Sequence, residues 1–180
     1  LIGYAGGGTR NIFANVPVAN MAELKGLPIR VQGAPIWSRV FDAFGAPPTV
    51  IAYNEVYNAI QTGVIKAAEN DAAGIEQMKF FEVGPYVALT QHAITVRPLC
   101  ISNKTFERLP EKLQQCILDA GAEAGAFGRE LENSQDAEKL QAMKDKGLLQ
   151  TVEFTDRAEM LALARPVIQA YAEELDAAAV

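Results

Sequence analysis

The sequence predicts an α/β fold with a mainly parallel sheet. Short apolar runs typical of β-strands alternate with segments whose apolar residues recur at helical spacing, and the alternation repeats several times in the first half of the chain. Glycine closes most of the helical segments. Strands and helices that alternate at such short intervals form right-handed βαβ units, which favours parallel strands.

The first half supplies four strand–helix pairs. The expected strands are residues 1–4, 29–32, 49–52 and 64–68. The expected helices are residues 21–25, 36–44, 55–62 and 71–79. The run Gly6-Gly7-Gly8 is expected to force a turn after the first strand. It lacks both the Gly-Lys-Ser/Thr ending and the GxGxxG spacing, so it does not predict a nucleotide site.

The second half has a different pattern. Two extended runs, residues 86–90 and 94–102, precede a long helical stretch at about 110–146 that is expected to loosen around its glycines, Gly121, Gly125 and Gly128. A last strand is expected at 149–154, followed by terminal helices that Pro166 divides in two.

Composition limits the classes of function. Of the 180 residues 49% are hydrophobic and 21% are charged, which is ordinary for a globular protein. The net charge of −6 argues against a nucleic-acid partner, because phosphate binding needs clustered Lys and Arg. No apolar run approaches the roughly 20 residues that a membrane span needs. Residues 1–4 lack the features of a signal peptide, so the chain is expected to be a fragment or a processed product.

Metal and thiol chemistry find little support in the sequence. Cys100 and Cys116 lie in apolar contexts and are expected to be small core residues. With His92 as the single histidine and no CxxC pair, we predict no metal site and no cofactor.

Polar side chains gather at the ends of the predicted strands, where α/β sheets bind ligands. Arg30 lies between Ile29 and Val31 in an apolar strand and faces away from both. An unpaired buried guanidinium is costly, so a carboxylate is expected to meet it. Arginine binds carboxylates through two parallel hydrogen bonds. The residues alone leave two partners open, a ligand acid and an internal Asp or Glu.

Four other residues are candidates for the same crevice. Gln32 follows Arg30, Tyr53 could either wall a pocket or pack at a strand end, and Asn70 could either contact a ligand or cap a helix. Arg10 is either solvated or part of the site.

Two further residues are harder to place. Trp37 lies on an apolar helix stripe that suggests the core, and its N–H needs a partner if it is buried. His92 could line a pocket as a hydrogen-bonding residue or be a satisfied hinge residue, and the second interpretation is favoured. No Gly-x-Ser-x-Gly elbow is present, and Glu69 and Asp71 are expected to point to different sides, so we assign no catalytic residue.

Several segments, in this order and spacing, resemble the DctP family, the extracytoplasmic solute-binding proteins of TRAP transporters. They are Leu-Lys-Gly-Leu-Pro-Ile-Arg-Val-Gln at 24–32, Phe-Gly-Ala-Pro-Pro-Thr at 44–49, Glu-Val-Tyr-Asn-Ala-Ile-Gln-Thr-Gly at 55–63, Glu-Asn at 69–70, Lys-Phe-Phe-Glu-Val at 79–83, Ile-Ser-Asn-Lys-Thr-Phe at 101–106 and Leu-Pro at 109–110. The resemblance covers nearly the whole chain. One departure is Ala-Ala-Glu-Asn-Asp at 67–71, where the family usually has Asp-Gly-Gln-Glu-Asn-Pro.

The resemblance implies a two-lobed periplasmic-binding-protein-like fold of type II. It implies that Arg30 forms the main salt bridge to an organic carboxylate and that Arg10 assists. Asn70 and Tyr53 would contact the ligand, and Gln32 and Trp37 are further candidates. Residues 8–95 and 136–180 would form the carboxylate-anchoring lobe II, and residues 1–7 and 96–135 would be a remnant of lobe I with the connecting helix.

The resemblance also implies partners and a location. The protein would capture a small organic acid in the periplasm and deliver it to membrane permease subunits. The character of Tyr53, Gln32 and Trp37 fits keto acids, dicarboxylates, sugar acids and aromatic acids alike. Most of lobe I would precede Leu1, and the exposed former interface could promote association of the chain. The alternatives are an α/β enzyme domain acting on a carboxylate, and the effector-binding domain of a regulator.

Overall fold

The computed structural model describes residues 1–176. Six strands form one sheet in the order β3-β2-β4-β1-β5-β6. The strands are β1 (Gly3–Ala14), β2 (Ile29–Val31), β3 (Pro48–Val50), β4 (Ala67–Asn70), β5 (Tyr86–Leu99) and β6 (Gln150–Val152). The α-helices are α1 (Met21–Leu24), α2 (Pro35–Ala43), α3 (Val56–Gln61), α4 (Ala72–Gln77), α5 (Asn103–Phe106), α6 (Glu111–Asp145) and α7 (Arg157–Glu174). Two 3₁₀ turns, Tyr53–Glu55 and Phe80–Glu82, complete the connections.

The sheet is mixed rather than mainly parallel. β2 runs parallel to β3 and β4, and β5 runs parallel to β6. The long central strand β1 is antiparallel to both neighbours, β4 and β5. The alternation of strands and helices therefore predicted the elements of the β3-β2-β4 unit correctly but not the direction of β1. Strand direction depends on how the chain returns to the sheet, and the hydrophobic pattern carries no information on that.

The glycine run lies inside a strand instead of forming a turn. β1 continues through it, with a register shift against β5 between Gly6 and Thr9. Gly6 and Gly7 have φ of 105° and 145°, which side chains rarely permit. The glycines thus accommodate a bulge that leaves the strand unbroken.

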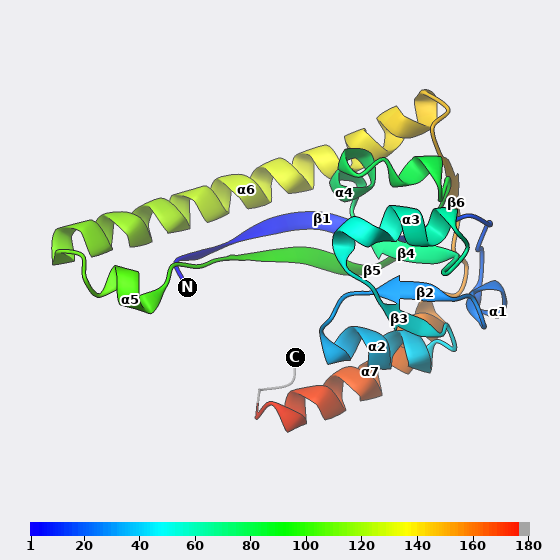
Figure 1. Ribbon diagram of the computed structural model, residues 1–180, viewed down its shortest axis with the longest axis horizontal. Coiled ribbons are helices and arrows are strands. Elements are labelled where there is room, and N and C mark those ends of the chain that lie inside the picture. Colours follow the sequence, from blue (N-terminus) through cyan, green and yellow to red (C-terminus); the bar gives the residue numbers. More distant parts are fainter. Residues whose placement is uncertain (177–180) are drawn as a thin grey trace.

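The low helix propensity of glycine predicted a looser helix around residues 121–128, but α6 is not loosened there. The helix is continuous and runs alongside β1 (Figure 1). Its three glycines face β1 and the preceding residue, Ile2. A Cβ on Gly125 would lie 2.5 Å from the carbonyl oxygen of Tyr4, and one on Gly121 equally close to that of Ile2. Their absence of a side chain lets α6 lie directly on the strand. Pro166 likewise does not divide α7. Proline has no N–H to bond the carbonyl of Ala162, one turn earlier, but both residues are exposed, so water can bond that carbonyl instead.

Two apolar layers cover the sheet. Ile12 and Phe13 are neighbours on β1 and point into different layers. The first layer is closed by α1, α2 and α7, and the second by α3, α4 and the C-terminal part of α6. Cys100 and Cys116 are both exposed, so the prediction that they are core residues was wrong.

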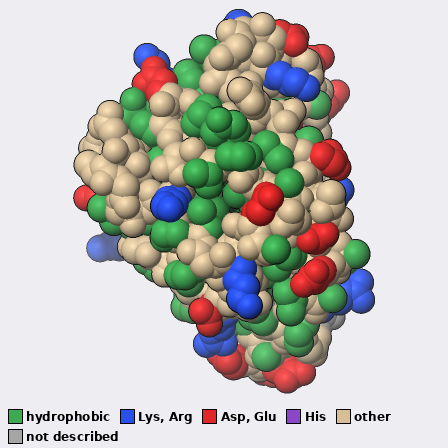
Figure 2. All heavy atoms as spheres, turned by 90° about the vertical axis from the view of Figure 1, so that its right-hand side faces the viewer, with side chains coloured by type: hydrophobic (Ala, Val, Ile, Leu, Met, Phe, Trp, Pro, Cys, Tyr) green, Lys and Arg blue, Asp and Glu red, His purple; other side chains and the backbone are tan. Residues whose placement is uncertain are grey.

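The globular part and an elongated part are distinct in Figure 1. β1, β5 and α6 run away from the two layers toward α5. At the opposite end, Figure 2 shows hydrophobic side chains interspersed with acidic and basic ones, and the Lys and Arg side chains on that face are separated from one another. None of the helices in residues 1–176 has the length and hydropathy of a membrane span.

Candidate carboxylate-binding site

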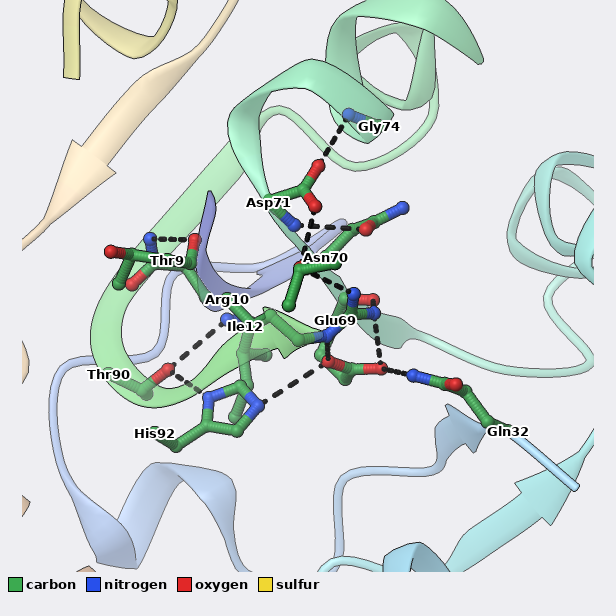
Figure 3. A network of polar contacts seen from close by, with 12 residues as sticks. Thr9, Arg10, Ile12, Gln32, Glu69, Asn70, Asp71, Gly74, Thr90 and His92 are labelled. Atoms are coloured by element: carbon green, nitrogen blue, oxygen red, sulfur yellow. Dashed lines mark hydrogen bonds and ion pairs between the residues drawn. The ribbon is translucent and has the colours of Figure 1, made fainter. Parts of the chain in front are cut away.

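The predicted site residues gather around β4, the strand between β1 and β2. Glu69 of β4 contacts Arg10 on one side and Gln32 on the other (Figure 3). Asn70, the last residue of β4, contacts Tyr53. The expected strand at 64–68 in fact lies at 67–70, because the chain only enters the sheet after the turn at Gly63, and this shift puts Glu69 and Asn70 inside the strand.

Arg10 has an internal counter-ion. Its guanidinium forms a two-bond ion pair with Glu69, in which Nε donates to Oε2 and Nη2 donates to Oε1 at 2.9 Å. Nη2 also donates to the Glu69 carbonyl and Nη1 to the hydroxyl of Thr95, at 3.1 and 3.2 Å. The Glu69 side chain is fully buried. Arg10 is therefore neither solvated nor free, and its charge is matched within the fold.

The ionisation of Glu69 follows from this pair. Burial opposes the charged carboxylate, but hydrogen bonding and attraction to His92 and Arg10 outweigh it and lower the pKa of Glu69 to about 2. The His92 Nε2 lies 3.5 Å from Oε2, which is long for a hydrogen bond. We therefore attribute most of the stabilisation to Arg10. Glu69 is an anion at any pH near neutrality.

His92 lies beside Glu69 and lines a cavity, which agrees with the pocket-lining interpretation rather than with the hinge that the sequence favoured. Its ring packs edge-on against Trp37 and Phe41. Its Nδ1 lies 2.8 Å from the Thr90 hydroxyl, which also accepts from the Ile12 backbone N–H at 3.3 Å. The Thr90 hydroxyl has one proton and two lone pairs, so it can serve either tautomer of the imidazole.

Arg30 differs from Arg10 in having no internal acid. It is 6% exposed, and its one hydrogen bond within residues 1–176 runs from Nε to the Ile51 carbonyl at 2.9 Å. The same residues include no carboxylate within 4.0 Å of it. Its guanidinium carbon lies 5.8 Å from the centre of the Tyr53 ring. Burial lowers the pKa of Arg30; the charge of Glu69 opposes this shift, and the charge of Arg10 adds to it. The internal ion pair that the sequence left open for Arg30 is thus formed by Arg10.

Asn70 and Tyr53 form one polar unit. The Asn70 amide donates to the Tyr53 hydroxyl at 3.0 Å, and its Oδ1 accepts from the Asp71 N–H at 2.9 Å. Asp71 caps α4 through the Gly74 N–H, so Asn70 is not the cap. Within residues 1–176, the second N–H of Asn70 and the hydroxyl proton of Tyr53 have no hydrogen-bond acceptor. The oxygen of Gln32, whose amide nitrogen donates to Glu69, is an available acceptor.

Trp37 is a packing neighbour of the site. It packs on Phe41, and its ring lies 6.0 Å from the guanidinium carbon of Arg10. It also lines an apolar cavity of about 460 Å³ bounded by α2, α7 and residues 90–93. Arg30, Tyr53 and Asn70 do not line that cavity.

The arrangement suits binding better than catalysis. A hydroxyl, an imidazole and a carboxylate, the groups of a catalytic triad, do lie next to one another in Thr90, His92 and Glu69. The Thr90 side chain is buried, however, and its oxygen is held by the Ile12 N–H. It therefore cannot attack a substrate, and what the site offers is fixed charge and hydrogen-bond donors. Within residues 1–176 no group of three or more His, Cys, Asp and Glu is placed to hold a metal ion.

These features describe a buried cluster of charged and hydrogen-bonding side chains in an α/β fold, and comparison with known proteins gives the family. The profile of the bacterial extracellular solute-binding proteins of family 7, DctP, matches residues 1–174. The chain belongs to this family, which consists of transport-associated binding proteins rather than enzymes.

Three similar proteins illustrate the relation. A solute-binding protein of Sulfitobacter sp. (strain NAS-14.1) is 54% identical over 177 residues, which is 98% of this chain and 54% of that protein. A crystal structure of a TRAP periplasmic solute-binding protein from Sulfitobacter sp. NAS-14.1 with bound α-D-taluronate has a TM-score of 0.96 at 54% identity, over 98% of this chain and 57% of that one. Another from Roseobacter denitrificans, with bound L-galactonate, has a TM-score of 0.86 at 34% identity, over 94% and 56%. The chain thus spans about half the length of the relatives it matches.

Proposed function

We propose that this chain is the carboxylate-anchoring part of a TRAP-transporter solute-binding protein, and that Arg30 clamps the acid group of the ligand. The observation that carries the proposal is the contrast between the two arginines. Arg10 is neutralised by Glu69, while Arg30, equally withdrawn from water, has two Nη groups and a positive charge without an acid partner in residues 1–176. A ligand carboxylate supplies that partner through two parallel hydrogen bonds.

The ligand class that fits best is a sugar acid. Around Arg30 the site keeps donors on Asn70 and Tyr53 and an acceptor on Gln32. Hydroxyl groups beside the carboxylate can use both kinds, whereas a simple alkyl acid would leave them unmatched. The two similar structures with bound taluronate and galactonate, both polyhydroxylated acids, support this choice. Trp37 would act indirectly, by packing behind Arg10.

The whole protein is proposed to have two lobes. Residues 8–95 and 136–180, of which 177–180 lie outside the described residues, would form the anchoring lobe. Residues 1–7 and 96–135 would belong to the opposite lobe and the connecting helix. The protein would work in the periplasm and deliver its ligand to the permease subunits of the transporter. The similar structures are described as periplasmic, which supports that location.

A thermal-shift screen tests the clamp. The protein as its gene encodes it is screened against D-taluronate, D-glucuronate, L-galactonate and succinate, because a ligand that binds only the folded state raises the melting temperature. The three sugar acids are expected to stabilise more than succinate. Arg30→Ala is expected to abolish the shift. The control Arg39→Ala removes an exposed arginine of α2, paired with Glu174, and is expected to leave the shift unchanged. Stabilisation that survives Arg30→Ala would refute the clamp.

A further inference from the structure

A single carboxylate on α6 joins two elements of the site. Asp136 accepts the Thr9 backbone N–H on Oδ2 at 3.0 Å and the Ala72 backbone N–H on Oδ1 at 3.2 Å. Thr9 belongs to β1 and directly precedes Arg10. Ala72 opens α4, two residues after Asn70.

Both N–H groups need an acceptor from outside their own element. Thr9 follows the bulge in which Gly6 and Gly7 take positive φ, where the register of β1 against β5 shifts. Ala72 is the first residue of its helix, and N–H groups of a first turn have no partner within the helix. Asp71, the cap of α4, uses Oδ1 for Gly74 and cannot serve Ala72.

The segments that contain Thr9 and Ala72 are also linked by side-chain hydrogen bonds. Asp71 Oδ2 accepts from the Thr95 hydroxyl at 2.7 Å, and the Thr95 oxygen accepts from Nη1 of Arg10 at 3.2 Å. Displacement of the start of α4 would therefore move Asp71, then Thr95, and then the guanidinium of Arg10. Arg10 is thus held from its backbone through Thr9 and from its side chain through Thr95.

The Arg and Lys side chains near Asp136 pair with other carboxylates. Arg97 of β5 pairs with Asp71 at 3.3 Å and with Glu132 at 3.1 Å, and Lys139 pairs with Glu76 at 3.1 Å. Among residues 1–176 Asp136 forms no ion pair. Burial raises the pKa of Asp136, as do the charges of Asp71 and Glu132, while the Thr9 and Ala72 N–H groups act in the opposite direction.

We infer that Asp136 is a positioning residue of the carboxylate site. It holds the backbone next to Arg10 and next to Asn70 in one fixed arrangement, and so sets the position of the Arg10–Glu69 pair and of the Asn70 amide that meets the ligand. α6 thereby becomes part of the binding machinery, although it contributes no side chain to the cluster around Glu69. The inference rests on the proposed function, because Asn70 is one of the residues proposed to bind the acid.

Asp136→Asn is the informative variant because asparagine keeps the size of the side chain but can accept only one of the two N–H groups at a time. Glu138→Gln, an exposed change on the same helix, is the matched control. In the protein as its gene encodes it, amide hydrogen exchange by NMR is expected to accelerate at Thr9 or Ala72, or both, in Asp136→Asn only. Affinity for the best-binding acid of the four-acid panel is expected to fall about tenfold, the effect of roughly one hydrogen bond to a charged group.

The outcomes separate this inference from the proposed function. A loss of melting temperature with unchanged affinity would make Asp136 merely structural and overturn the inference, as would unchanged exchange at both amides. Asp136→Ala, which removes both acceptors, is expected to weaken binding further than Asp136→Asn, and equal affinities for the two would also count against it. If the unaltered protein binds none of the four acids, the proposed function fails first and the role of Asp136 falls with it.

Discussion

Arg10 and Arg30 lie on the two strands that flank β4, and they differ in one respect that decides their roles. Glu69 on β4 faces Arg10 and is buried with it, so that pair is complete without a ligand. Arg30 has only the Ile51 carbonyl as a hydrogen-bond partner within residues 1–176. A buried charge is tolerated when an opposite charge pairs with it. Arg10 and Glu69 together carry no net charge, so Arg30 carries the buried charge that still lacks a counter-ion within residues 1–176.

Stability of the chain is expected to depend on the ionisation of Glu69. Its pKa is about 2 in the fold against an ordinary 4.5. A depressed pKa contributes stability that is fully present above the ordinary value and is lost as the pH falls through the folded value. The expected loss is about 3 kcal/mol at most, incurred between roughly pH 4.5 and pH 2. Urea unfolding across that range measures it.

Glu69→Gln provides the comparison. It leaves Arg10 buried without a counter-ion and is expected to lower the free energy of unfolding at neutral pH by about 3–5 kcal/mol. It should also flatten the pH dependence. Glu76→Gln breaks the half-exposed pair with Lys139 and is expected to cost under about 1 kcal/mol. A Glu69→Gln variant with the same acid dependence as the unaltered chain would show that other groups cause it.

At the scale of elements, sequence patterns predicted what depends on neighbours along the chain. The strand with Arg30, the helix with Trp37 and the long helix all lie close to where they were expected. The partners of Arg10 were missed, because Glu69 is 59 residues away and reaches Arg10 only through the pairing of β4 with β1. The place of His92 likewise depends on β5 lying beside β1, which no local signal carries.

The glycines of α6 show the same limit and lead to a test. In isolation, Gly→Ala within a helix stabilises it by about 1 kcal/mol. At Gly125 the added Cβ would lie 2.5 Å from the Tyr4 carbonyl oxygen, which forces α6 away from β1. Gly125→Ala is therefore expected to lower the free energy of unfolding by about 1–3 kcal/mol despite its better propensity. Chemical denaturation measures the change.

A nearby exposed residue separates contact from propensity. Ala124 points away from β1, so Ala124→Gly is expected to cost only the propensity difference of about 1 kcal/mol. A stabilised Gly125→Ala variant would mean that α6 does not lie closely on β1.

At the scale of the whole molecule, the elongated part has one covered face and one open face. Gly3 and Ala5 face α6, and so does Arg97, which bonds to Glu132 of α6. Thr95 lies on the same face of β5 as Arg97, and both bond to Asp71. Strand alternation therefore turns Tyr4, Ile94 and Val96 to the other side, where they are 50%, 65% and 65% exposed. Grouped apolar side chains of this kind are typical of an interface.

We expect the 180-residue chain to associate through that open face when it is produced by itself. Burial of three large apolar side chains per copy would favour dimers as concentration rises, because the apolar area removed from water drives association. Replacing Ile94 and Val96 by lysine is expected to shift the chain to the monomer, since charges on a strand face resist pairing with another chain. Leu161→Lys, which also replaces an exposed apolar residue but on α7, is the control and is expected to leave association unchanged. Sedimentation velocity over a range of concentrations distinguishes the two variants. A monomer at every concentration, or an equal effect of both substitutions, would show that the exposed face of β1 and β5 does not mediate association.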